Sequence, residues 1–298
     1  LIDVLVTVKA GGVHDGLAGQ AMLTADSLLL GSAKLTKPKF EQALDFVGAQ
    51  VSSGANLEYS YVKLSMAKVD QDSLLTILRD AVLTPAFDQA EFDKHKTRYL
   101  AQLEQQKESP RQVIKSYFDE VLYAGHPYAN RVEGTAASVA DIDLASVKQF
   151  HTTWYQPDNS AIVITGDFDS KAMKSKIEKL FSSWQGKAPK FNLEQQLPKP
   201  TEATVLLVNK SDANESTFMI GGPGIKRSNP DYVALSVINT VLGARFTSWL
   251  NDELRVNSGL TYGAGSRFDS RMAGGSFYIS TFTKTESTNE AMDLALST

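Results

Sequence analysis

The sequence predicts an α+β protein with two structurally repeated domains, each an antiparallel sheet covered by helices on one face, the second copy being truncated. First, strand-like and helix-like segments follow the same order in both halves of the chain. Second, strands are followed by runs of helices, which favours α+β over an alternating parallel arrangement. Third, a segment with three prolines and no periodic apolar face is typical of a linker. We therefore expect domains at residues 1–188 and 203–298, joined by residues 189–202.

The first half opens with an alternating strand. Ile2, Val4, Val6 and Val8 fall on one face of that strand, and Ala10-Gly11-Gly12 ends it. The remaining segments are assigned from apolar periodicity and from Gly, Pro and capping residues. They are helices at 17–30 and 36–47, a hairpin of 49–53 and 57–69, helices at 70–82, 88–107, 111–122, 143–154 and 170–184, and a strand at 160–166.

The second half repeats this order after the linker. We expect strands at 203–208 and 217–221, a turn at 222–224, helices at 229–242 and 245–255, strands at 260–268 and 275–283, and a helix from about residue 286. The chain opens inside a strand and closes inside a helix, so we expect it to be a fragment of a longer protein.

Composition excludes several classes of protein. Hydrophobic residues make up 42% of the 298 residues and charged residues 21%, which is ordinary for a globular protein. The net charge of −4 indicates a poor general binder of nucleic acid, which needs a basic surface. The sequence has no cysteine, so disulfides, thiolate metal sites and a cysteine nucleophile are excluded. No apolar run reaches the roughly 18 residues of a membrane span.

Common catalytic motifs are absent from the sequence. The four histidines are His14, His95, His126 and His151, and none lies three or four residues from another. A helix therefore cannot present two imidazoles on one face, as H-x-x-E-H does, and we expect no complete zinc site in this chain. His126, in Gly-His-Pro-Tyr, is assigned to a turn. The sequence also lacks a G-x-S-x-G nucleophile motif and a P-loop.

One segment places two hydrogen-bond donor side chains at the two ends of a short connection, where they can lie close together. Arg255 is expected on the last turn of a helix and Tyr262 at the start of the next strand, joined by Asn257-Ser258-Gly259. A guanidinium and a phenol brought together could bind a peptide carbonyl or a developing oxyanion. The structural alternative is a helix-end arginine that binds carbonyls and a tyrosine that fills the sheet. The residues alone leave both interpretations open.

These residues and the repeat resemble the pitrilysin/insulinase-like (M16) zinc peptidases, which include mitochondrial processing peptidase and bacterial two-subunit relatives. The resemblance covers nearly the whole chain and consists of short motifs in the family's order. They are Ala10-Gly11-Gly12, Gly16-Leu17-Ala18, Gly31-Ser32, Ser53-Gly54-Ala55-Asn56, Thr84-Pro85-Ala86-Phe87, Gly125-His126-Pro127-Tyr128, Gly134-Thr135, the segment Trp154–Asn159, Gly166-Asp167 and Trp184.

The sequence departs from the family at the metal site. In active members Gly-Leu-Ala runs into H-x-x-E-H, whereas here it is followed by Gly19-Gln20-Ala21-Met22-Leu23. The more distant glutamate ligand of the family falls near Ala101 or Gln102, and Glu104 close by cannot hold zinc without the histidines. The resemblance therefore implies a subunit that binds no zinc and that has no cofactor of its own.

The resemblance also implies roles for the residues that are retained. Arg255 and Tyr262 match the family's L-R-x-x-x-G-L-x-Y pattern, and by resemblance they bind the substrate carbonyl in trans. The edge hairpin, with Ser53, Gly54, Ala55 and Asn56, is expected to bind substrate. An H-x-x-E-H subunit is the expected partner, as a heterodimer, and would hold the zinc; a homodimer is the alternative assembly when the chain is isolated.

Two alternative functions are open to this chain, and the resemblance implies a cellular location. A catalytically inactive scaffold or peptide-binding protein fits the missing ligands equally well. An independent hydrolase has no motif to support it. By resemblance to bacterial relatives, the expected location is the periplasm or cell envelope, and the alternative is the cytoplasm.

Overall fold

The computed structural model describes residues 1–193 and 197–298. The chain forms two compact units, one of Leu1–Gln105 with Asn130–Phe191 and one of Gln106–Ala129 with Asn192–Thr298. The two repeated sheets fall in different units, and residues 106–129, from the first half of the sequence, group with the second unit. Residues 194–196 of the predicted linker, 189–202, lie outside the described residues.

The sheet of the first unit has four antiparallel strands in the order β2-β3-β1-β4. Its strands are β1 (Ile2–Val8), β2 (Gln50–Ala55), β3 (Ser60–Met66) and β4 (Ser160–Gly166). Val4 of the central strand β1 lies opposite Leu64 on one side and Ile164 on the other. Alternate residues of β1 are buried, because successive side chains of a strand point to opposite faces. This confirms the predicted one-sided sheet.

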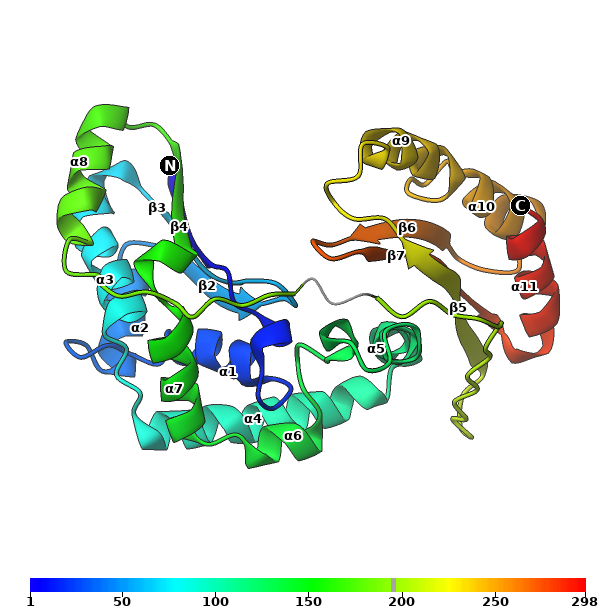
Figure 1. Cartoon of the computed structure of the whole chain (residues 1–298), viewed down its shortest axis with the longest axis horizontal. Coiled ribbons are helices and arrows are strands. Elements are labelled where there is room, and N and C mark those ends of the chain that lie inside the picture. Colours follow the sequence, from blue (N-terminus) through cyan, green and yellow to red (C-terminus); the bar gives the residue numbers. More distant parts are fainter. Residues whose placement is uncertain (194–196) are drawn as a thin grey trace. The chain divides into compact units, whose positions relative to one another are not determined.

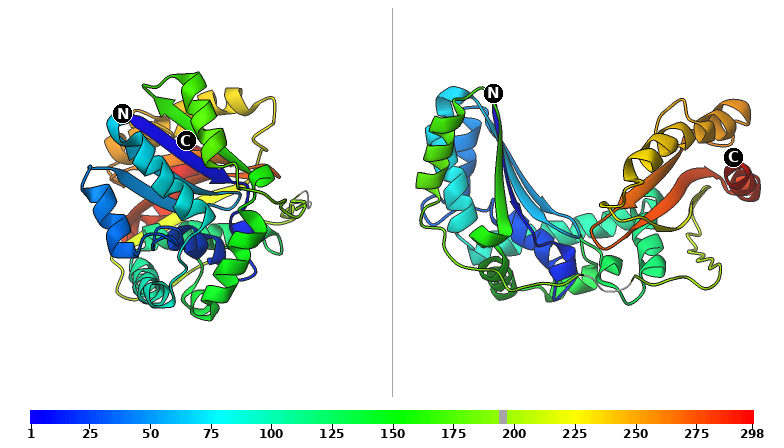
Figure 2. Two further views of the ribbon diagram at one scale, coloured as in Figure 1. Left: turned by 90° about the vertical axis from the view of Figure 1, so that its left-hand side faces the viewer. Right: turned by 45° about the horizontal axis from the view of Figure 1, so that its top comes forward.

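Helices cover the buried face of this sheet (Figures 1 and 2). α2 (Lys37–Asp45), α3 (Gln71–Leu83) and α8 (Ser170–Leu180) contribute Phe40, Leu44, Leu74, Leu75, Leu78 and Met173 to the core around β1 and β3. Each of these helices places apolar residues three or four positions apart, which produces one apolar stripe per helix.

A second core lies among the remaining helices of the first unit. They are α1 (Gln20–Ser27), α4 (Gln89–Lys107), α6 (Ala136–Asp141) and α7 (Leu144–Trp154). Their buried side chains include Leu23, Phe92, Leu103, Val139 and Val147. The short helix α6 was not predicted from the sequence. It begins at a capping box in which Thr135 Oγ1 accepts a hydrogen bond from Ser138 N at 3.0 Å.

The second unit repeats the topology of the first. Its elements are α5 (Pro110–Leu122), β5 (Glu215–Gly224), α9 (Tyr232–Leu242), α10 (Trp249–Asn251), a π-helical turn at Asp252–Asn257, β6 (Ala264–Ser270), β7 (Gly275–Lys284) and α11 (Thr288–Ser297). The strand order β5-β7-β6 corresponds to β1-β3-β2 of the first sheet. The predicted structural repeat is therefore confirmed.

The two faces of the second sheet have different neighbours. On β7, Ile279 packs with Leu250, Leu254 and Ala291 of the helical layer. Tyr278, the adjacent residue, points to the opposite face, where its ring lies 5.8 Å from that of Phe118 on α5. The segment 106–129 thus adds a helix on the face of this sheet that the repeat alone leaves uncovered.

Two predicted strands of the second half are wrong in whole or in part. Residues 203–208 form no strand, and Val205 and Leu207 are 77% and 88% exposed. Apolar residues alone do not make a strand, because a strand also needs a neighbour for its backbone hydrogen bonds. The strand predicted at 260–268 begins at Ala264, so Tyr262 precedes β6 instead of opening it.

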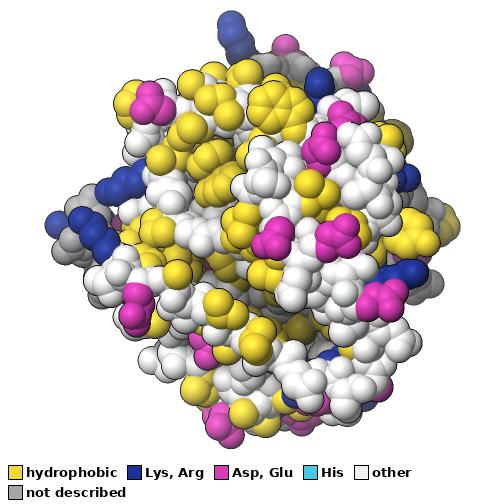
Figure 3. All heavy atoms as spheres, turned by 90° about the vertical axis from the view of Figure 1, so that its right-hand side faces the viewer, with side chains coloured by type: hydrophobic (Ala, Val, Ile, Leu, Met, Phe, Trp, Pro, Cys, Tyr) yellow, Lys and Arg dark blue, Asp and Glu magenta, His cyan; other side chains and the backbone are white. Residues whose placement is uncertain are grey.

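The surface of the second unit exposes apolar side chains. Val233, Val237 and Ile238 of α9 are each more than half exposed, as is Leu296 of α11. Figure 3, viewed from the side of α11, shows hydrophobic side chains gathered on this surface. Within the described residues, no helix combines the length and the hydropathy that crossing a bilayer requires.

Candidate functional site

The first turn of α1 and its N-cap carry the residues that the resemblance places at the family's zinc-binding positions. Gly19 is the N-cap of the helix, with a φ of 99° that favours glycine. The Asp15 carboxylate accepts hydrogen bonds from Gly19 N at 3.0 Å and from Ala21 N at 2.8 Å. Gln20 Nε2 donates to Ser146 O at 2.8 Å. This turn is therefore occupied by hydrogen bonds that hold the helix in place.

The other aligned positions belong to the protein interior. Leu23 is fully buried in the core with Phe92, Val139 and Val147. The described portions of the chain contain no group of three histidine, aspartate or glutamate side chains placed to hold a metal ion. A left-handed glycine and a buried leucine offer no electron pair to a cation. The residues at this turn therefore do not fit zinc.

The helix α4 carries the residues that the resemblance places at the more distant ligand position. Ala101 and Gln102 are exposed on its surface, and Glu104 is exposed as well. Leu103, between them, is buried against the core of Leu23. The contact between α4 and α1 is thus apolar at this point. A separate polar contact joins His95 Nε2 to Asp26 Oδ2 at 3.1 Å.

His126 lies in the turn that follows α5 and is buried. Its Nδ1 accepts a hydrogen bond from Tyr128 N at 3.1 Å. This geometry agrees with the turn role assigned from the sequence.

The edge hairpin places its predicted residues at the free side of the first sheet. Ser53, Gly54 and Ala55 belong to β2, an edge strand of the sheet, so among the described residues one side of their backbone has no neighbouring strand. Asn56 has a different position, because its Oδ1 accepts hydrogen bonds from Glu58 N and Tyr59 N at 2.8 and 2.9 Å. Such an Asx turn shapes the hairpin. Peptide binding by these residues stays a prediction.

The hairpin turn also rests on the loop after β1. Asn56 O accepts a hydrogen bond from Gly12 N at 2.8 Å. A Cβ on Gly11 would lie 2.2 Å from the same oxygen, so only glycine permits this approach. The Ala10-Gly11-Gly12 motif therefore positions the edge strand.

Arg255 and Tyr262 lie at the two ends of a folded-back connection. Arg255 is in the π-helical turn, and Thr261 N donates to Leu254 O at 3.1 Å, which brings the neighbouring backbones together. The two side chains rest on different rings. The Arg255 guanidinium lies 4.5 Å from the Phe246 ring centroid, and Tyr262 stacks on Phe282 at 6.5 Å. Their joint role at a substrate carbonyl stays a prediction.

Tyr262 is presented to solvent on an aromatic support. Its side chain is 81% exposed. On the supporting ring of Phe282 lies the guanidinium of Arg111, 3.2 Å from the centroid, and Arg111 pairs with Glu215 at 2.5 Å. This support could not be predicted from local sequence patterns, because Arg111, Glu215 and Phe282 lie far apart along the chain. The tyrosine is thus held in place with its hydroxyl free of the protein core.

Asp15 was not foreseen as a site residue, although an aspartate just before a helix is a common cap. Burial raises its pKa from 3.8 to about 7, against the lowering effect of its backbone hydrogen bonds. The folded protein therefore keeps this proton at pH values where the unfolded chain releases it. Ionising the buried carboxyl costs stability, so its contribution falls as pH rises.

We expect Asp15→Asn to change the pH dependence of stability. The free energy of unfolding of the native protein, minus that of the variant, should fall as pH rises from about 4 to about 7 and then level off. Urea denaturation at several pH values measures this difference. Asp141→Asn, an exposed change on α6, serves as control. A difference that is flat across this range would contradict the assigned protonation.

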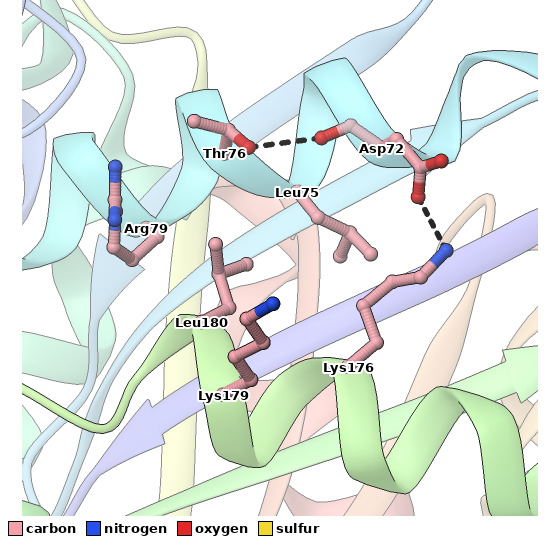
Figure 4. Close-up of a pocket in the computed structure, with 7 residues that line it drawn as sticks. All are labelled: Asp72, Leu75, Thr76, Arg79, Lys176, Lys179 and Leu180. Carbon is pink, nitrogen blue, oxygen red and sulfur yellow. Dashed lines mark hydrogen bonds and ion pairs between the residues drawn. The ribbon is translucent and has the colours of Figure 1, made fainter.

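A separate groove lies between α3 and α8 (Figure 4). Leu75 and Leu180 line it, and an ion pair from Lys176 to Asp72 joins the two helices. Exposed pairs of this kind contribute little stability. None of the lining residues is a predicted site residue, so we assign this groove to helix packing.

The fold and the altered metal site agree with the comparison to known families. Residues 2–136 match the model of insulinase, peptidase family M16, and residues 141–298 match that of the peptidase M16 inactive domain. The chain therefore belongs to peptidase family M16, as the motifs of its sequence indicated.

Individual relatives carry names of both kinds, zinc protease and non-peptidase homolog. The "uncharacterized zinc protease YmxG" of Bacillus subtilis is 24% identical over 232 residues, which cover 78% of this chain and 56% of the relative. The "non-peptidase homolog YmxG" of Helicobacter pylori is 28% identical over 246 residues, covering 82% and 56%. This chain thus spans a little over half the length of these curated relatives.

A solved structure has the same fold over almost the whole chain. The crystal structure of a peptidase M16 inactive domain from Pseudomonas fluorescens aligns with a TM-score of 0.88 and 28% sequence identity. The alignment covers 99% of this chain and 72% of that one.

Proposed function

We propose that this chain is the non-zinc subunit of a heterodimeric zinc metalloendopeptidase that cleaves extended peptides. A partner subunit with H-x-x-E-H supplies the metal and the general base, and this chain supplies Arg255, Tyr262 and half of the chamber. The observation that carries the proposal is the exposed phenol of Tyr262, held on Phe282, in a chain whose α1 lacks every zinc ligand. A tyrosine that only filled the sheet would be buried.

The residues have distinct roles in this proposal. The Tyr262 hydroxyl and the Arg255 guanidinium donate hydrogen bonds to the carbonyl oxygen of the scissile bond, where negative charge develops. The free edge of β2 at Ser53–Ala55 pairs with the backbone of the substrate, which gives affinity with little dependence on sequence. The cell envelope is the proposed location.

Experiments that mix this chain with a zinc-binding relative test whether the two polypeptides form one active enzyme. The chain alone should bind no stoichiometric zinc and cleave no peptide. An H-x-x-E-H relative from the same source should form a complex with it, and the complex should cleave a fluorogenic peptide faster than the relative alone. Zinc content, size-exclusion chromatography with light scattering, and initial rates measure the three results. Cleavage by this chain alone would overturn the proposal.

The second candidate is a scaffold or peptide-holding protein without a catalytic role. The buried Leu23 and the hydrogen-bonded turn at Gly19 favour it, because they show a helix stabilised without metal. A complex that forms but gains no activity would support this candidate.

A further inference from the structure

The first unit has a groove beside the free edge of β2. It lies between α2 and the beginning of β2, is open to solvent and has a volume of about 710 Å³. Ligand sites typically fall within about 300–1,000 Å³, so the groove has room for a short stretch of peptide. Its β2 residues are Gln50, Val51 and Ser52, which directly precede the predicted peptide-binding residues Ser53–Ala55. A peptide strand paired along β2 would therefore run beside this groove.

The floor of the groove is apolar. Leu29, Phe40, Leu44, Ala49 and Val51 line it, and Phe40 and Leu44 belong to the core of the unit. These side chains are fixed by packing, so the floor is formed before any ligand arrives. An apolar floor suits a side chain with a long aliphatic portion.

The rim of the groove carries an unmatched negative charge. Glu41 pairs with Lys37 one turn earlier on α2, and Lys63 pairs with Asp3 at 3.7 Å. Asp45, at the end of α2, is exposed and forms no ion pair with another described residue. The Asp45 carboxylate is thus available to bind a cationic group of a ligand that lies on the apolar floor.

We propose that this groove receives a lysine or arginine side chain from a peptide strand bound along the edge of β2. The aliphatic stem lies on Leu44 and Val51, and the cationic end reaches the Asp45 carboxylate. The inference rests on the proposed function, because it requires a peptide paired to β2. It adds a preference for one basic residue to an interaction that is otherwise made through the backbone.

Peptide binding to the purified chain tests the groove and the edge separately. The probes are fluorescent ten-residue peptides of Ser and Val in which one Lys, norleucine or Glu is moved through each position. At one position we expect Lys to bind about fivefold more tightly than norleucine, as for an exposed ion pair, and Glu to bind more weakly than either. The preference should shrink in high salt.

Two variants test whether the preference for Lys over norleucine arises at the groove. Asp45→Asn should bring Lys to the affinity of norleucine and leave the affinity of norleucine unchanged. Asp141→Asn, which removes the same charge from an exposed site outside the groove lining, should keep the Lys preference. A Lys preference that survives Asp45→Asn, or equal affinities at every position, would overturn the groove assignment.

A backbone control separates this inference from the proposed function. Peptides with N-methyl groups on alternate residues cannot pair with a strand edge on that side, so they should lose binding whatever their side chains. Binding that N-methylation abolishes, without any charge preference, leaves the edge interaction standing and rejects the groove. Absence of binding by every peptide rejects both.

Discussion

Tyr262→Phe should lower kcat of the assembled heterodimer by about 10²–10³-fold, the cost of removing one oxyanion donor. The ring of phenylalanine can keep the stacking on Phe282, so the change removes the hydroxyl alone. KM should change little, because the lost hydrogen bond strengthens only as charge develops on the carbonyl oxygen. Initial rates over a range of peptide concentrations separate the two constants.

A matched control comes from the same unit. Tyr232→Phe removes a hydroxyl from a ring that lies 3.8 Å from the Arg227 guanidinium, outside the proposed site. It should leave kcat unchanged. Arg255→Met, which keeps an unbranched stem for packing on Phe246, should also lower kcat. If Tyr262→Phe and Arg255→Met assemble normally and turn over at the native rate, the scaffold function is favoured.

Leu23→His should destabilise the first unit by about 3–5 kcal/mol. The substitution removes a fully buried side chain from the core with Phe92 and Val147. The loss of buried aliphatic contacts is on the scale of core truncations, about 2–5 kcal/mol, and a buried imidazole without a partner adds to it. Urea unfolding measures the loss. Met22→Glu, at a partly exposed position of the same turn, should cost less than about 1 kcal/mol.

The same substitutions test whether the turn can hold a metal. Gly19→His, Met22→Glu and Leu23→His together restore the letters H-x-x-E-H. We expect no stoichiometric zinc in this triple variant, because the φ of 99° at Gly19 strains a histidine and Val139 Cγ2 lies only 3.1 Å from its Cβ position. A folded variant with one tightly bound zinc ion would show that the turn adapts more readily than its packing indicates.

Elements with strong local signals could be predicted from the sequence. The strand at 160–166 was placed correctly, because a short apolar run lay between clear breaks. The strand at 203–208 was wrong, because apolar residues do not reveal whether a pairing partner lies beside them. The π-helical turn around Arg255 was not predicted from the sequence; in the structure, Leu250 before the turn and Leu254 within it are buried in the core of the second unit.

The candidate site could likewise be predicted only where the information is local in the sequence. The missing zinc ligands are visible directly in Gly19–Leu23. What replaces them was not, because the Asp15 carboxylate and the packing of Leu23 involve the exact backbone path and residues more than a hundred positions away. The support of Tyr262 by Phe282 and Arg111 is likewise a contact between distant segments.

The packing of Leu23 also bears on how such a protein can change over generations. A lineage that reintroduced one ligand at a time would pass through unstable intermediates before any ion could bind and compensate. Selection removes such intermediates long before the full set is assembled. The packing of Leu23 therefore makes recovery of a zinc site unfavourable at the Leu23→His step, before an ion could compensate for the lost stability.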